Sequence, residues 1–174
     1  MKLSTIFITG LSLIMASCSP ASQNSSQPSN SDSQTHGTQM TKTNAPAIHT
    51  VKSSYTFSET ITRLEAGLDK RPLNLFAKID HAAGAAKAGQ TLAPSTVFIF
   101  GNPKGGTPLM TRNPQMGIVL PLKMHIYQDG DAVKLSYTDI EAEAKLHGLD
   151  SAELPIPNIK KMLSGLAAEV TTAP

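Results

Sequence analysis

The sequence predicts an α+β fold in which helices pack on a twisted, largely antiparallel sheet. Alternating apolar residues flank a tight turn at Asp129-Gly130, which is the pattern of a β-hairpin. Stretches with helical spacing of apolar residues lie apart from that hairpin. A hairpin beside isolated helices favours an α+β fold with a largely antiparallel sheet. The region 47–174 is near the commonest domain size, so we expect one compact domain with its own core.

The first half of this domain contains three expected strands and two expected helices. Thr56 and Glu59 match a capping box, which predicts the start of a helix. Alternation in the segment before Asp80 predicts a half-buried strand, and Gly89 is a natural residue to follow a helix end. The expected elements, in order, are a strand at 48–53, a helix at 57–69, a strand at 73–80, a helix at 82–87 and a strand at 97–100.

A glycine-rich segment, 101–107, follows the last of these strands and is the first candidate site. Thr107-Pro108 has the pattern of an N-cap followed by a first-turn proline. Backbone N–H groups and the helix start could hold a small anion, with a lysine adding charge. A purely structural glycine turn before a capped helix is the alternative, and the lysine position rules out a Walker A loop. The candidate ligand-binding residues are Gly101, Asn102, Lys104, Gly105, Gly106 and Thr107.

The second half of the domain is expected to begin with the hairpin. Its strands are predicted at 121–127 and 133–137. Asp139 is expected to cap a helix that ends at Gly148. An extended segment at 155–157 and a last helix capped by Asn158 complete the chain.

Two further groups of polar residues are candidate sites. Asp80 and His81 end a strand and could perform acid–base chemistry or bind a metal, although the pattern more simply predicts that Asp80 caps the following helix. Lys123, His125 and Tyr127 share one strand face, which would be either a binding patch or a solvated surface. The histidines lie far apart in the sequence and no hydrolase or metalloprotease signature is present, so the sequence predicts no metal site. No cofactor fingerprint is present, so the sequence implies no particular cofactor.

The N-terminus has the features of a cleaved secretory signal at 1–17. Its apolar run, 6–14, is too short to span a bilayer, which needs roughly 20 residues. Small residues precede Cys18, the single cysteine, in a pattern that resembles a bacterial lipobox. That resemblance implies cleavage before Cys18 and attachment of lipid to it. An ordinary signal peptide followed by an incidental cysteine is the alternative.

The segment 18–46 is rich in Ser, Gln, Asn and Thr, so it is expected to be a disordered tether. Ser19 after the cysteine resembles the sorting signal for the outer membrane of two-membrane bacteria, on its periplasmic side. We therefore expect a cell-envelope protein whose membrane partner is reached through Cys18. The chain carries 15 Lys and Arg against 13 Asp and Glu, which is no electrostatic footprint for a nucleic-acid partner.

Several motifs in consistent order carry a family resemblance. They read T-F-S-E-T-I-T-R-L-E, I-D-H-A-A-G-A-A-K-A-G, F-I-F-G-N-P-K-G-G-T-P-L-M, V-L-P-L-K-M, S-Y-T-D and K-L-H-G-L. From about Ser54 to the C-terminus the chain resembles domain-of-unknown-function family 302. The resemblance implies a compact α+β domain built from one strand, a helix, four strands and a helix. It implies almost nothing about chemistry, because a fold alone does not define an activity.

Three functions are consistent with these patterns. The preferred one is a lipid-tethered binding module that holds a small anion or metabolite at the 101–107 segment. The second is an enzyme that uses Asp80, His81 or His125 as acid–base groups. The third is an interaction module that binds an envelope partner through a surface patch.

Overall fold

The structure is a computed structural model that describes residues 48–149 and 154–173. The expected signal, Cys18 and the expected tether lie outside the described residues. The elements are β1 (Ile48–Lys52), α1 (Phe57–Asp69), β2 (Asn74–Asp80), α2 (His81–Lys87), β3 (Ser95–Gly101), α3 (Pro103–Arg112), α4 (Met116–Val119), β4 (Leu122–Asp129), β5 (Ala132–Thr138), α5 (Ile140–Leu146) and α6 (Ile156–Thr171).

The strands of the described region form one five-stranded sheet in the order β1-β5-β4-β3-β2, and every neighbouring pair is antiparallel. This confirms the predicted α+β fold. The β4–β5 hairpin closes where Asp129 pairs with Ala132, and Gly130 supplies a φ of 56° that favours glycine. The two loop residues are therefore Gly130 and Asp131, one position beyond the predicted pair.

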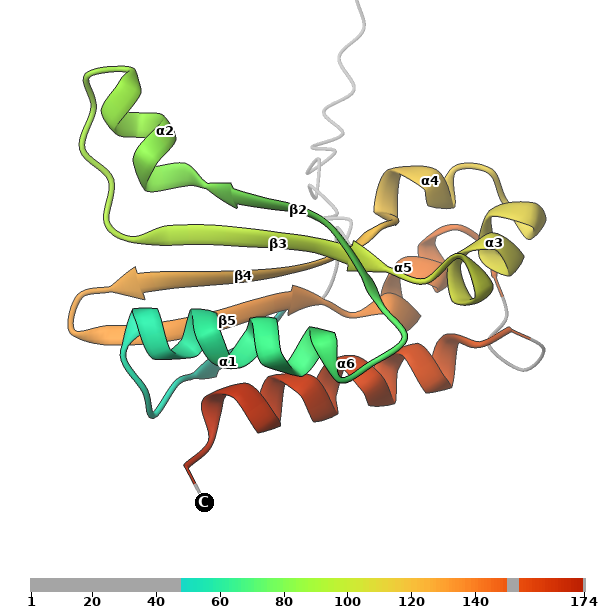
Figure 1. The fold of residues 1–174 in the computed structure, drawn as a ribbon. Helices are drawn as coiled ribbons and strands as arrows, with labels where there is room; N and C mark the ends of the chain where they lie inside the picture. Colours follow the sequence, from blue (N-terminus) through green and yellow to red (C-terminus); the bar gives the residue numbers. More distant parts are fainter. Residues whose placement is uncertain (1–47, 150–153, 174) are drawn as a thin grey trace, which may run out of the picture. The chain divides into compact units, whose positions relative to one another are not determined.

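Helices α1 and α6 run side by side along one face of the sheet (Figure 1). Their apolar stripes and the inward-facing residues of β3, β4 and β5 form the core. Each large side chain buried there contributes about 1.5–3 kcal/mol. Fully buried members include Leu64 of α1, Leu166 of α6, and Phe98, Met124 and Leu135 of the sheet. We call the opposite face of the sheet the open face.

The capping box of α1 is present as predicted. Thr56 Oγ1 accepts from the backbone N–H of Glu59, and Glu59 Oε2 accepts from the backbone N–H of Thr56 at 3.0 Å. One turn later, Arg63 donates to the carbonyl oxygens of Glu169 and Val170 near the end of α6. Side chains of α1 thus fix both its own start and the end of the helix beside it.

Strand β2 is an edge strand and is largely exposed, contrary to the half-buried strand that its alternation predicts. Phe76, which lies at a register shift between Leu75 and Ala77, is 55% exposed. At its end, Asp80 caps α2, which stands away from the sheet and has no buried residue (Figure 1).

Helix α3 begins earlier than the sequence predicts. Asn102 is its N-cap and Pro103 its first residue, so Thr107 is not a cap and Pro108 lies inside the helix. The backbone N–H groups of Gly105 and Gly106 donate to the Asn102 carbonyl oxygen at 3.0 Å. These two amides are first-turn helix donors and do not line an open anion-binding loop.

Helix α6 also begins earlier than predicted, at Ile156. The expected extended segment 155–157 is wrong, and Asn158 lies within the first turn rather than at the cap. Pro157 is compatible with this position because the first N–H groups of a helix have no intrahelical partner. No helix in the two described ranges is long and apolar enough to cross a bilayer.

Candidate functional site

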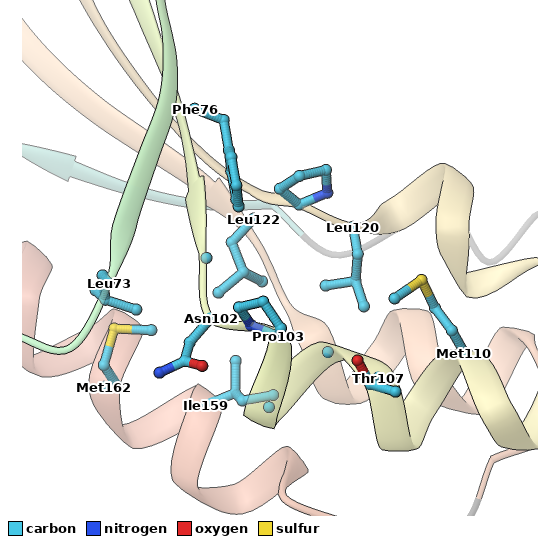
Figure 2. Close-up of a pocket in the computed structure, with 14 residues that line it drawn as sticks. Leu73, Phe76, Asn102, Pro103, Thr107, Met110, Leu120, Leu122, Ile159 and Met162 are labelled. Atoms are coloured by element: carbon cyan, nitrogen blue, oxygen red, sulfur yellow. The ribbon is translucent and has the colours of Figure 1, made fainter.

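An apolar cavity of about 210 Å³ lies beside the start of α3 (Figure 2). Its walls come from segments far apart in the chain: the approach to β2, the strand β2, the segment between α4 and β4, and helices α3 and α6. Apolar side chains from all of these converge on it. The main ones are Leu73, Phe76, Leu120, Leu122, Ile159 and Met162.

Asn102 fixes the α3 side of this cavity. Its Oδ1 accepts from the backbone N–H of Lys104 at 2.9 Å, and its Nδ2 donates to the Pro72 carbonyl oxygen at 2.6 Å. One side chain therefore starts α3 and ties it to the segment that leads into β2. Both the oxygen and the nitrogen of the Asn102 side-chain amide therefore have partners within the fold.

The absence of side chains at Gly105 and Gly106 leaves room beside α3. A Cβ on Gly105 would lie 3.8 Å from Ile159 Cδ1, and a Cβ on Gly106 would lie 3.4 Å from Leu120 Cδ1. Larger side chains at these positions would project toward residues that line the cavity. The two glycines thus help to keep the cavity open.

The 101–107 segment therefore contributes to a cavity, although not to the kind that its sequence predicts. Gly101, Asn102, Gly105, Gly106 and Thr107 are lining residues, whereas Lys104 is not. The predicted arrangement of free glycine amides around an anion is wrong, because those amides are hydrogen-bonded within the first turn. The lining of this cavity is mainly apolar. The apolar walls were missed because their periodicity marks them only as core residues.

The other candidate residues gather on the open face of the sheet. Asp80 Oδ1 accepts from the backbone N–H of Ala83 at 2.9 Å, which confirms its capping role. His81, the next residue, lies edge-on to His125, with 6.0 Å between the ring centroids. His125 stacks on Tyr127 at 4.8 Å. The fold has thus joined two of the predicted acid–base residues, which sequence spacing alone could not show.

His125 is held in a defined environment. Its Nε2 lies 2.8 Å from the Oγ of Ser95, a buried hydroxyl that the sequence did not single out. Burial, and secondarily the neighbouring His81, lower the pKa of His125 below its usual value. Both effects disfavour the charged ring and so favour the neutral imidazole.

A second cavity, of about 480 Å³, is lined by His81, His125 and Lys123. The Lys123 ammonium group donates to the carbonyl oxygens of Val119 and Pro121 at 3.2 and 3.1 Å. The two cavities share no lining residue. The acid–base candidates and the 101–107 segment therefore do not form one site. Residues 48–149 and 154–173 contain no group of three or more His, Cys, Asp or Glu side chains placed to hold a metal ion.

Proteins of known sequence and of known structure resemble this chain. It is 37% identical over 118 residues to "Fluoride-specific ion channel FluC 1" of Brucella suis biovar 1 (strain 1330), and equally to the protein of that name in Brucella abortus biovar 1 (strain 9-941). The match covers 67% of this chain and 45% and 43% of those relatives, so the chain spans less than half of their length.

A solved structure has the same fold. It is the crystal structure of an uncharacterized conserved DUF302 protein from Bacillus stearothermophilus, with a TM-score of 0.64 and 22% sequence identity. The similarity covers 71% of this chain and 97% of the other. Residues 49–169 match the family described as "Domain of unknown function DUF302". Together with the fold and the ordered motifs, this match places the chain in the DUF302 family.

Proposed function

We propose that this domain is a binding module for a small apolar ligand, which it holds in the cavity beside α3. The observation that carries the proposal is the convergence of apolar side chains from β2, α3, α6 and the start of β4 on one open space. Interiors of proteins are normally close-packed, and dry apolar cavities of about 150 Å³ bind ligands such as benzene. At about 210 Å³, this cavity has room for a somewhat larger molecule.

The lining also indicates how a ligand would enter and what it would contact. Phe76 and Met110 line the cavity and are 55% and 36% exposed, so they form its rim. The thioether side chains of Met110 and Met162 adapt readily to the shape of a ligand. Thr107 offers a hydroxyl group at the wall. A compact, mainly apolar molecule fits this environment better than a free anion does.

The test is a titration of the full chain with naphthalene, followed by ligand fluorescence and by backbone NMR. Gly105→Leu places a bulky side chain against the cavity, so we expect affinity to fall at least tenfold. Gly165→Leu is the matched control, because nothing lies within 4 Å of the added Cβ and the position is exposed. Lys104→Ala should leave affinity unchanged, since Lys104 is not a lining residue.

Equal binding by Gly105→Leu and the unsubstituted protein would refute an apolar site at this cavity. Fluoride is the second probe, because the Brucella relatives are named fluoride channels. We expect no fluoride-induced shifts at Gly105 or Gly106, whose amides are already hydrogen-bonded. Shifts there that disappear in Lys104→Ala would instead support anion binding.

We further propose that the module acts in the cell envelope, tethered by lipid at Cys18. The support is the lipobox-like sequence and the polar segment that follows it. A tether would keep the module near a membrane, where apolar molecules concentrate. The enzyme alternative has less support, because the acid–base candidates lie at a separate cavity.

A further inference from the structure

We infer that His81 and His125 form a binding site for a borderline transition-metal ion, such as Zn²⁺, Cu²⁺ or Ni²⁺, on the open face of the sheet. This site is separate from the apolar cavity and does not depend on the proposed function. The two residues are 44 positions apart in the sequence. Strand pairing brings them together, because Asp80 pairs with Thr96 and Val97 pairs with His125.

Both imidazoles have nitrogens available for a metal. His81 makes no side-chain hydrogen bond within the described ranges, and it is exposed. His125 uses Nε2 with Ser95, and its Nδ1 has no hydrogen-bond partner in the part of the chain that the structure describes. Neutral imidazole is the commonest protein ligand for metals.

Ser95 gives His125 the support that metal-binding histidines usually have. In such sites the nitrogen that does not bind the metal commonly donates to a fixed neighbouring acceptor, which sets the tautomer and the ring orientation. The Ser95 hydroxyl is buried and lies 2.8 Å from Nε2, and Tyr127 stacks on the ring. The His125 ring is therefore restrained before any ion arrives.

The surroundings leave space for the rest of the coordination sphere. His81 and His125 line the cavity of about 480 Å³, which can admit water molecules as further ligands. The described residues contain no third His, Cys, Asp or Glu close enough to complete a three-ligand group. The site would therefore bind an exchangeable ion rather than a structural one, which normally has four protein ligands. Imidazole favours Zn²⁺, Cu²⁺ and Ni²⁺ over Mg²⁺, which prefers oxygen ligands.

The first experiment adds ZnCl₂ to the untagged full chain and follows the imidazole ¹H–¹⁵N NMR signals. We expect the His81 and His125 rings to shift together at the same ion concentrations. The rings of His49 and His147 should not change at those concentrations, and MgCl₂ should change none of them. Shifts confined to other histidines, or no shifts, would overturn the assignment. This measurement needs no substitution, so it does not depend on a variant folding.

The second experiment measures Zn²⁺ affinity by calorimetry in His81→Ala and His125→Ala. Loss of one of two protein ligands should weaken binding by about tenfold or more, since even supporting residues around metals contribute 10–100-fold. His147→Ala is the matched control, because His147 follows α5 and does not line this cavity. Unchanged affinity in His81→Ala, which removes an exposed side chain, would contradict the proposed pair.

Discussion

Asn102 illustrates how one side chain can set the geometry of a cavity. Its side-chain oxygen, Oδ1, accepts from the backbone N–H of Lys104 and so caps α3. Its side-chain nitrogen, Nδ2, donates to the carbonyl oxygen of Pro72 in the segment before β2. A typical N-cap contributes about 1 kcal/mol, and a hydrogen bond contributes a similar net amount. Thr107 does not cap α3, although Thr107-Pro108 has the sequence pattern of a helix start.

Replacing these two residues distinguishes the observed cap from the predicted one. We expect Asn102→Ala to lower the free energy of unfolding by about 1–3 kcal/mol, because both the cap and the link to Pro72 are lost. Thr107→Ala should change it by less than about 0.5 kcal/mol. Urea unfolding monitored by circular dichroism measures both. A larger loss in Thr107→Ala than in Asn102→Ala would mean that α3 begins at Thr107 after all.

At the scale of elements, helices α1 and α6 approach each other closely at Gly67 of α1. A Cβ at this position would lie only 2.6 Å from Leu166 Cδ1 of α6, and Leu166 is fully buried. The terminal methyl of a leucine can move where there is space, but here it is enclosed by the core. The missing side chain therefore allows α1 and α6 to pack closely on the sheet.

Gly67→Ala should destabilise the fold even though alanine is the better helix former. Overpacking costs about 1–3 kcal/mol, and the higher helix propensity of alanine returns roughly 1 kcal/mol, so we expect a net loss near 1 kcal/mol. Gly165→Ala, on the exposed side of α6, should instead gain about 0.5–1 kcal/mol, because nothing lies near the added Cβ. Chemical denaturation of the two variants measures both changes in the free energy of unfolding, which should have opposite signs. Stabilisation by both substitutions would show that α6 moves easily.

The sequence predicts those elements that depend on local signals. Thr56, Asp80 and Asp139 each cap a helix where expected, because their side chains bond to amides two or three residues away. The predicted start of α3 is wrong, because two N-cap and proline pairs, Asn102-Pro103 and Thr107-Pro108, lie close together in this segment. Asn102-Pro103 prevails over Thr107-Pro108 because Asn102 also bonds to Pro72, a contact between residues 30 positions apart.

The candidate sites were harder to predict than the elements, because they depend on sheet order. Alternation in β2 predicts a buried face, but only the order of strands shows that β2 lies at the edge. The sequence singles out the 101–107 segment as a candidate, but it does not predict the apolar cavity that this segment lines, since the apolar walls come from β2, α6 and the start of β4. Likewise, only strand register brings His81 to His125.

For the domain as a whole, alternation along one strand separates the two candidate sites. Leu122 of β4 faces the core and lines the apolar cavity, whereas Lys123 and His125 face the opposite side and line the second cavity. Helices α1 and α6 cover only the first of these faces (Figure 1). A ligand in one cavity and an ion at the other would therefore be separated by the sheet itself.

The final prediction concerns attachment of the chain to a membrane through Cys18. Each buried methylene of an acyl chain contributes about 0.8 kcal/mol, so several chains on one cysteine would hold the protein firmly at a bilayer. In a host with the lipoprotein pathway, the unsubstituted protein should fractionate with membranes and carry the mass of a lipidated cysteine. Cys18→Ser should shift it to the soluble fraction. The double variant Cys18→Ser and Ser22→Cys keeps one thiol but moves it away from the lipobox-like sequence, so it should also be soluble. Membrane attachment of either variant would show that the anchor is not a lipid placed by this sequence at Cys18.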